Sequence, residues 1–150
     1  MAEKVYLNGG LVDTDKALIS AWDGGFLYGY GVFETIRAWN GQPFRLNAHL
    51  ERLFQSCKLL RINVSGMEVG KAVYSVLAAN NLSNARIRVT ISPGKQMQLA
   101  RLAWYDNPTL LVTATCLEPD SETVFEKGFK LVTSGYRRGV NSVVSRIKSV

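Results

Sequence analysis

The sequence has few of the residues that mark disulfide-rich, metal-binding or membrane-spanning proteins. Its only cysteines, Cys57 and Cys116, lie far apart and outside any metal-ligand spacing, and His49 is its single histidine. We therefore expect a reduced, cytoplasmic protein without a metal site. No apolar run approaches the ~20 residues that a transmembrane helix needs. The opening MAEKVYLN also lacks the continuous apolar stretch of a secretory signal. We expect no membrane partner.

Acidic residues are missing from the last part of the chain. Residues 1–126 contain twelve basic and twelve acidic side chains, whereas residues 127–150 contain six basic side chains and no acidic one. A basic tail of this kind could bind a polyanion, which makes a non-catalytic interaction domain one reading of the chain. The same residues are rich in Val, Ile, Phe and Tyr, unlike a solvated arm. We favour a piece of a second domain, and we expect no nucleic-acid partner.

Two pairs of strands and one helix are predicted in the first part of the chain. Alternating apolar residues around turn residues predict a β-hairpin over residues 5–12. A strand over residues 32–39 is followed by an Asn-Gly turn and a return strand over residues 43–46. A helix then begins with Asn47 as its N-cap. Its apolar stripe consists of Leu50, Leu53, Phe54, Cys57 and Leu60.

A second helix and two further strands are predicted next. The residues from Ser65 to Glu68 fit a capping box, and Asn80 marks the end of the helix. Its apolar face consists of Val69, Val73, Val76 and Leu77. A strand over residues 85–92 alternates between an apolar face of Ile87, Val89 and Ile91 and a polar face of Arg86, Arg88 and Thr90. Another apolar strand covers residues 109–117.

These elements indicate an α+β fold, because the strands and helices do not alternate strictly. We expect a small domain over residues 1–117, with an antiparallel sheet and two helices. Residues 118–126 contain the run EPDSET, which is typical of a linker. A new strand is predicted over residues 129–134, so residues 127–150 would be the first strands of a truncated second domain.

Three motifs carry a resemblance to a known family. The run DGGFLYGYGVFETIRAWNGQPFRLNAHLERLFQSCKLL at residues 23–60 resembles the opening signature of the class IV (fold-type IV) aminotransferases. The runs ARIRVTISPG at residues 85–94 and NSVVSRIKSV at residues 141–150 follow in the family's order and spacing. The family includes branched-chain and D-amino-acid aminotransferases and aminodeoxychorismate lyase. The resemblance implies pyridoxal 5′-phosphate as cofactor, amino acids and 2-oxo acids as substrates, and a homodimer for the intact protein.

Lys148 is the catalytic residue that the resemblance implies. The matching lysine of the family forms a Schiff base with pyridoxal phosphate and then carries a proton between the substrate α-carbon and the cofactor. This chemistry needs a primary amine that is nucleophilic near neutral pH. Without the resemblance, Lys148 would be interpreted as an ordinary surface lysine.

Arg52 matches the family's phosphate-binding arginine. A guanidinium suits a phosphate dianion because its planar fork donates two parallel hydrogen bonds. At ~100° per residue, Arg52 lies ~200° around the helix from Leu50, away from the core stripe. A cofactor or solvent could reach it there. For His49, one turn earlier, we expect a partly exposed structural role.

Tyr28, Phe33 and Arg88 match positions of the substrate pocket. The two aromatic residues correspond to side chains that line the pocket of branched-chain aminotransferases, although Phe33 could equally belong to the core. Arg88 corresponds to an arginine that, in some members, helps to hold a substrate carboxylate or a neighbouring loop. The glycine-rich stretch 24–31 leads into a strand, so we expect a tight backbone path and not a dinucleotide fingerprint.

The resemblance implies transamination between an amino acid, branched-chain type favoured, and a 2-oxo acid through Lys148. Aminodeoxychorismate lyase is the first alternative, and D-amino-acid transfer is the second. In the family, the carboxylate that pairs with the pyridine nitrogen and part of the phosphate cup follow the lysine. We therefore expect this chain to be an amino-terminal half that is inactive when isolated.

Overall fold

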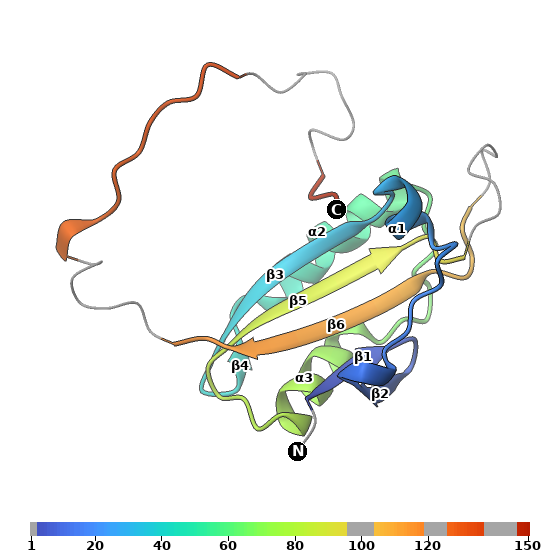
Figure 1. Ribbon diagram of the computed structural model, residues 1–150, viewed down its shortest axis with the longest axis horizontal. Coiled ribbons are helices and arrows are strands. Elements are labelled where there is room, and N and C mark those ends of the chain that lie inside the picture. Colours follow the sequence, from blue (N-terminus) through green and yellow to red (C-terminus); the bar gives the residue numbers. More distant parts are fainter. Residues whose placement is uncertain (1–2, 96–103, 119–125, 137–146) are drawn as a thin grey trace.

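A single six-stranded sheet dominates the computed structural model, which describes residues 3–95, 104–118, 126–136 and 147–150. All neighbouring strands are antiparallel, in the order β2-β1-β6-β5-β3-β4. The strands are β1 (Lys4–Leu7), β2 (Gly10–Asp13), β3 (Val32–Trp39), β4 (Gln42–Pro43), β5 (Ala85–Ser92) and β6 (Thr109–Cys116). Figure 1 shows the sheet face on, with helices α2 (Leu46–Leu59) and α3 (Val69–Ala79) behind it. The predicted α+β class is confirmed.

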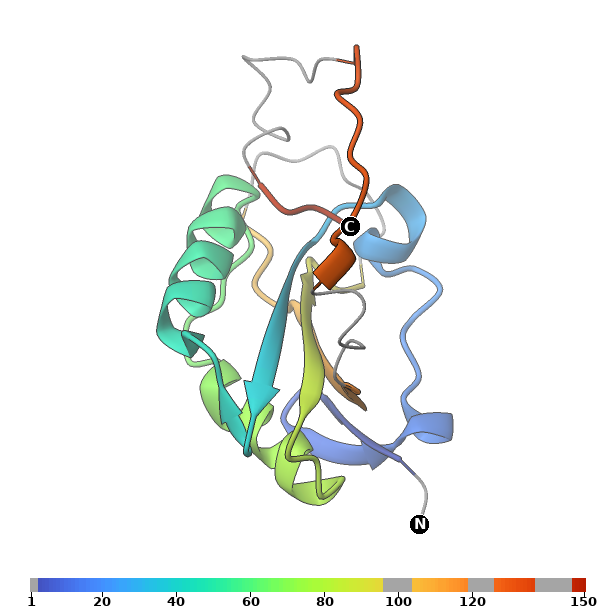
Figure 2. The same ribbon diagram turned by 90° about the vertical axis from the view of Figure 1, so that its left-hand side faces the viewer.

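The core lies between the sheet and these two helices. Figure 2 shows both helices on the same side of the sheet. Every second residue of β5 points toward them, and Ile87, Val89 and Ile91 are fully buried, as the alternation predicts. On α2 and α3 the buried stripes contain Leu53, Cys57, Val69, Val73, Val76 and Leu77. The helical and strand periodicities of the sequence therefore meet in one apolar layer.

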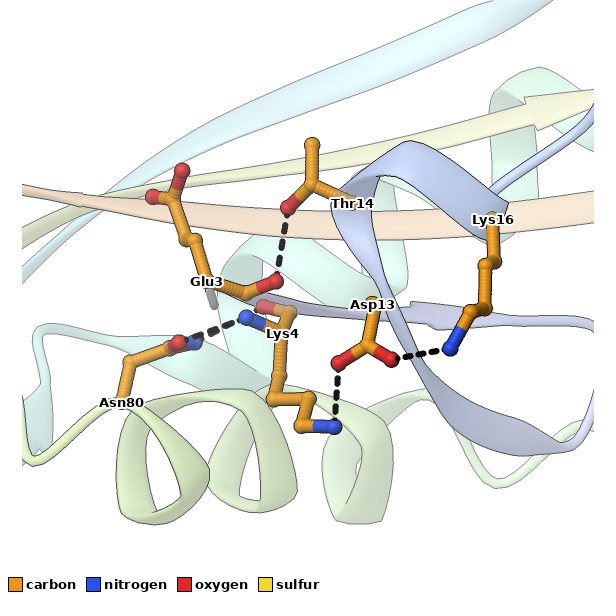
Figure 3. Close-up of polar contacts among 6 residues, drawn as sticks. All are labelled: Glu3, Lys4, Asp13, Thr14, Lys16 and Asn80. Carbon is orange, nitrogen blue, oxygen red and sulfur yellow. Dashed lines mark hydrogen bonds and ion pairs between the residues drawn. The ribbon is translucent and has the colours of Figure 1, made fainter. Parts of the chain in front are cut away.

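Asn80, the residue after α3, connects this helix to the hairpin of β1 and β2. Its side-chain amide donates to the Lys4 carbonyl oxygen and accepts from the Lys4 backbone nitrogen, each at 2.8 Å (Figure 3). On the neighbouring strand, Asp13 forms ion pairs with Lys4 and Lys16. Hydrogen bonds from these two lysines lower the pKa of the Asp13 carboxyl to about 2. The predicted hairpin is confirmed.

The start of α2 differs from the prediction. The helix begins at Leu46, so Asn47 lies within the helix and is not its N-cap. Arg45 takes the N-cap position in a left-handed conformation, with φ of 48°. The return strand is also shorter than predicted and ends at Pro43, because Arg45 already adopts the left-handed conformation that starts α2.

The predicted capping box at the start of α3 is wrong. The helix begins at Val69 with Glu68 as N-cap, and no side chain caps it. Ser65 instead belongs to a turn, in which its backbone nitrogen donates to the Asn63 side-chain oxygen at 3.0 Å. Gly66 follows with φ of 77°, a left-handed conformation that an α-helix does not allow. The local turn therefore delays the helix by one turn.

The glycine-rich stretch forms a short helix that was not predicted, α1 (Gly24–Tyr28), which follows a 3-10 turn η1 (Thr14–Lys16). Buried Asp23 caps it by accepting a hydrogen bond from the Gly25 backbone nitrogen at 2.7 Å. The other Asp23 oxygen accepts from the hydroxyls of Ser92 and Thr109, which fix the start of α1 to β5 and β6. The sequence signal is weak because glycine is a poor helix former.

The strand predicted over residues 129–134 is not formed. These residues have no strand assignment, and Leu131 and Val132 are 89% and 94% exposed. An extended segment needs a neighbouring strand for its backbone groups, and the described residues provide none here. Most of the predicted linker, at residues 119–125, lies outside the described residues, so the domain boundaries stay a prediction. Within the described part, no helix is long and apolar enough to cross a membrane.

Candidate active site

Residues 148–150 lie along the free edge of β3, where that strand begins. The Phe33 backbone nitrogen donates to the Lys148 carbonyl oxygen at 2.9 Å, and the Val150 nitrogen donates to the Gly31 carbonyl oxygen at 3.1 Å. Between them, Val32 and Ser149 form an antiparallel bridge. The end of the described chain is thus held against the glycine-rich stretch by backbone hydrogen bonds.

This close approach favours a glycine at position 31. A Cβ there would lie 2.9 Å from the Val150 side chain and 3.0 Å from the Ile91 carbonyl oxygen. The preceding residue of the terminal segment, Ile147, is buried and joins the core cluster. Packing and backbone pairing therefore both fix the position of Lys148.

The Phe33 ring contacts two cations on the outer face of the sheet, the face opposite α2 and α3. The Lys148 Nζ atom is 4.9 Å from the ring centroid, and the Arg88 guanidinium carbon is 3.7 Å from it. Cations at these distances are attracted by the negative face of an aromatic ring. The structure thus brings together three residues singled out in the sequence, and Phe33 is only partly buried.

On the inner face of β3, the Glu34 carboxylate contacts two side chains of α2. Its two carboxylate oxygens accept hydrogen bonds from Nε and Nη2 of Arg52, each at 2.6 Å. The Oε2 atom also lies 2.8 Å from Nδ1 of His49. Glu34 is only 1% exposed, whereas the Arg52 side chain is 58% exposed. The pair therefore anchors one edge of the guanidinium and leaves the rest of it accessible.

Electrostatics keep the Glu34 carboxyl ionised. Burial by itself raises the pKa of the Glu34 carboxyl, but the hydrogen bonds from Arg52 and His49 and the charges of Arg52 and Lys148 bring the pKa below its usual value. The same contact raises the pKa of Arg52. Since the Lys148 charge acts on Glu34, the lysine amine lies within electrostatic reach of the Arg52 cluster as well as of Phe33.

Tyr28 is the predicted site residue that remains apart. It lies in the last turn of α1, is exposed, and its side chain makes no hydrogen bond to any described residue. The helix ends immediately after it, at Gly29 in a left-handed conformation. The structure therefore places Tyr28 near the path to β3 but gives its side chain no hydrogen bond or ring contact with the other described candidates.

Glu34 and its contact with His49 were missed in the sequence. The alternation of β3 places Glu34 on the same side as buried Val32 and Ile36, which is unusual for a carboxylate. An acid on the apolar face of a strand, followed by a helix with two bases three residues apart, is a recognisable signal. His49 is partly buried, in agreement with the expected structural position.

The described part of the chain offers no cluster for a metal ion, and its buried cysteine, Cys57, is not a reactive thiol. It contains no group of three or more His, Cys, Asp or Glu residues placed to hold a metal ion. Cys57 is buried in the core, and this burial raises the pKa of its thiol to about 12, so the thiolate is not formed near neutral pH.

Comparison with known proteins defines the family. The family model Amino-transferase class IV matches residues 31–150, which include Glu34, Arg52, Arg88 and Lys148. The chain belongs to the class IV aminotransferases. Within this family, it is 37% identical over 149 residues to aminodeoxychorismate lyase of Bacillus subtilis, covering 97% of this chain and 50% of the lyase. It is 31% identical over 93 residues to D-alanine aminotransferase of Staphylococcus haemolyticus, covering 61% and 33%.

The solved structures agree with this class IV fold. The branched-chain amino acid aminotransferase of Escherichia coli superposes with a TM-score of 0.83 at 27% identity, over 99% of this chain and 50% of that enzyme. The chain therefore spans about half the length of the relatives that it matches. The antiparallel sheet with α2 and α3 is the part of the class IV fold that it provides.

Proposed function

We propose that the protein containing this chain is a pyridoxal-phosphate-dependent enzyme that transfers an amino group between an amino acid and a 2-oxo acid. One observation carries the proposal: Lys148 and Arg52, 96 positions apart in the sequence, contact two consecutive residues of β3. The Lys148 amine lies 4.9 Å from the centroid of the Phe33 ring, and the Arg52 guanidinium pairs with Glu34. The membership of the chain in the class IV family supports the same reaction class.

The residues present fit the cofactor. Nε and Nη2 of Arg52 are held by Glu34, while Nη1 has no acceptor among the described residues and the side chain is largely exposed. A phosphate dianion could accept hydrogen bonds from this exposed side of the guanidinium. The exposed amine of Lys148 would be the attachment point. Glu34 would act as a positioning residue, since it fixes the orientation of Arg52 through two hydrogen bonds.

The chain's own groups have separate tasks in this proposal. When bound, pyridoxal phosphate supplies the electron sink that stabilises negative charge at the substrate α-carbon. The Lys148 amine takes the proton from the α-carbon of the donor amino acid. In the second half of the exchange it returns a proton to the α-carbon of the product amino acid. Phe33 shields one side of the amine from water, and its contact with Arg88 fixes the position of both side chains. We also propose a homodimer for the whole protein, as expected from its family.

Two substrate assignments each have an observation in their favour. The Escherichia coli structure and a Thermoproteus uzoniensis structure with norvaline bound, at 31% identity and a TM-score of 0.66, are both named branched-chain aminotransferases, so branched-chain transfer is our first candidate. The Bacillus subtilis relative favours aminodeoxychorismate lyase as the second. Transfer from leucine to 2-oxoglutarate, measured against pyruvate release from aminodeoxychorismate, distinguishes the two.

Covalent labelling tests the proposed role of Lys148. The whole protein is incubated with pyridoxal phosphate and reduced with borohydride, and its peptides are analysed by mass spectrometry. We expect the cofactor mass on Lys148, and no label at this site in Lys148→Ala. Lys58→Ala, on the exposed surface of α2, is the matched control and should be labelled normally at Lys148. A protein that binds no cofactor, or carries it on another lysine, would refute the proposal.

A further inference from the structure

The Glu34 carboxylate accepts one hydrogen bond more than its pairing with Arg52 provides. Its Oε1 accepts from Nε of Arg52 and its Oε2 accepts from Nη2, each at 2.6 Å. Oε2 also lies 2.8 Å from Nδ1 of His49. An ionised carboxylate has no proton to donate, so Nδ1 of His49 is the donor of this third hydrogen bond. Two donors of α2 therefore share one buried acceptor of β3.

The third hydrogen bond is not needed to keep the buried carboxylate paired. Each Glu34 oxygen already has a donor from Arg52, so neither would be left without a partner if His49 were absent. An apolar side chain of similar size could fill the same space beside the helix. What the imidazole adds is a hydrogen bond with a fixed direction.

This bond restricts a rotation that the other two leave free. Two parallel hydrogen bonds hold the Arg52 guanidinium in the plane of the Glu34 carboxylate. The last torsion of a glutamate side chain has a broad energy minimum, so the carboxylate plane can turn together with the guanidinium. A donor from a third side chain opposes that turn. His49 therefore helps to decide where the exposed edge of Arg52 points.

His49 can hold this orientation because it is itself held. It lies in the first turn of α2, where its backbone nitrogen donates to the Arg45 carbonyl oxygen at 3.2 Å. Its side chain is 22% exposed, whereas that of Arg52 is 58% exposed. Glu34 is the only hydrogen-bond partner of the His49 ring among the described residues, so no other contact there competes for its orientation.

We infer that His49 is a positioning residue for the cofactor phosphate: it fixes the Glu34 carboxylate, which in turn holds Arg52 in the orientation that binds the phosphate. This inference rests on the proposed function, in which Arg52 is the phosphate-binding residue, and deepens it. His49 acts through two other side chains and makes no contact of its own with the phosphate. Its removal should therefore weaken phosphate binding specifically.

Two ligands that differ only in a phosphate group test this inference in the whole protein. Pyridoxamine 5′-phosphate and pyridoxamine have an amine in place of the aldehyde, so neither forms a Schiff base with Lys148. Titration calorimetry gives the ratio of their affinities, which measures the contribution of the phosphate. We expect His49→Ala to weaken pyridoxamine 5′-phosphate binding about fivefold, as for the loss of one hydrogen bond. Pyridoxamine binding should change less than about twofold.

A pair of substitutions of similar size separates orientation from packing. His49→Asn keeps an N–H donor close to the position of Nδ1 and should restore most of the preference for the phosphate form. His49→Leu fills the space without a donor and should behave like His49→Ala. A merely structural role would be met at least as well by leucine as by asparagine. Gln55→Ala, on the exposed side of α2, is the matched control and should leave both affinities unchanged.

A double variant tests whether His49 acts through Arg52. Arg52→Gln should remove most of the phosphate preference, and adding His49→Ala should then change the affinity ratio less than about twofold. Additive effects of the two substitutions would overturn the inference. So would an unchanged phosphate preference in His49→Ala, which would leave the proposed function intact. Equal binding of the two ligands by the wild-type protein would overturn the role of Arg52 and the inference together.

Folding of each variant is checked by circular dichroism before the titrations. If His49→Ala does not fold, the asparagine and leucine variants decide the question between them. Equal phosphate preferences in these two variants would overturn the inference.

Discussion

The two faces of β3 differ in how their charged side chains are paired. On the inner face, the Glu34 carboxylate is buried and meets two basic side chains of α2, Arg52 and His49, at hydrogen-bond distance. On the outer face, Arg37 and Arg86 face each other across two strands without an acidic neighbour among the described residues. The inner cluster is satisfied by the chain itself, whereas the outer pair has no acidic partner among the described residues.

This difference separates the buried Glu34, which orients Arg52, from the exposed arginines of the outer face, which are accessible to a ligand. A buried acid with bidentate contacts holds its arginine in one orientation before any ligand arrives, which reduces the ordering cost of binding. Exposed arginines without partners contribute little to folding, and their charge remains available to a ligand. Residues that appear equivalent by composition therefore have different roles, decided by the face on which they lie.

The largest expected effect comes from breaking the inner cluster. Glu34→Ala removes a buried acceptor and leaves Arg52 and His49 without their partner, so we expect a loss of about 1–3 kcal/mol in the free energy of unfolding. Arg86→Ala on the outer face should change it by less than about 0.5 kcal/mol. Urea unfolding of both variants measures the contrast. Equal effects of the two substitutions would contradict the distinction between the faces.

Lowering the pH should weaken the inner cluster of Glu34, Arg52 and His49 over a defined pH range. The folded-state pKa of Glu34 lies below its ordinary value of 4.5. Its ionised form therefore contributes stability above that value, and this contribution is lost as the pH falls through the lower folded-state pKa. The stability difference between the wild-type protein and Glu34→Gln should be constant near pH 7 and shrink below about pH 4.5. A difference that grew with acid would mean that the carboxyl is protonated in the folded state.

A smaller effect, of opposite sign, is expected on the outer face. Arg86→Thr removes the like-charge contact with Arg37, so at low salt the protein should gain a few tenths of a kcal/mol in stability. The gain should vanish at 1 M salt, where the screening length is about 3 Å. Arg37→Thr should act in the same way, and the double variant should show no additional gain. A stability loss above about 1 kcal/mol in Arg86→Thr would show that this arginine already has an acidic partner.

The strands were more predictable than the ends of the helices. The predicted strand over residues 32–39 has the observed bounds of β3, and the predicted alternation of β5 has the observed buried face. The helix starts at Asn47 and Ser65 were wrong, because the conformations of Arg45 and Gly66 decide where the helices begin. Periodicity is a property of a whole segment, whereas a cap depends on one residue's backbone angles.

The candidate site was only partly accessible from the sequence. Lys148, Arg52 and Arg88 were identified through the resemblance to the class IV family, since nothing in their local sequence sets them apart. Glu34 was missed, although its position among the apolar residues of β3 indicated a buried acid. The pairing of Arg37 with Arg86 could not be predicted from the sequence. The two residues are separated by about fifty residues of chain, and local patterns do not define the register between β3 and β5.

The sequence by itself determined the alternation of β3, β5 and β6, the apolar stripes of α2 and α3, and the family motifs. These features follow from local geometry, in which side chains repeat every two residues in a strand and about every 3.6 residues in a helix. Only the tertiary structure decided which charges meet. Backbone pairing carried Lys148 to the start of β3, helix packing brought Arg52 to Glu34, and strand register placed Arg37 opposite Arg86. Contacts between residues distant in the sequence depend on packing, which no local pattern encodes.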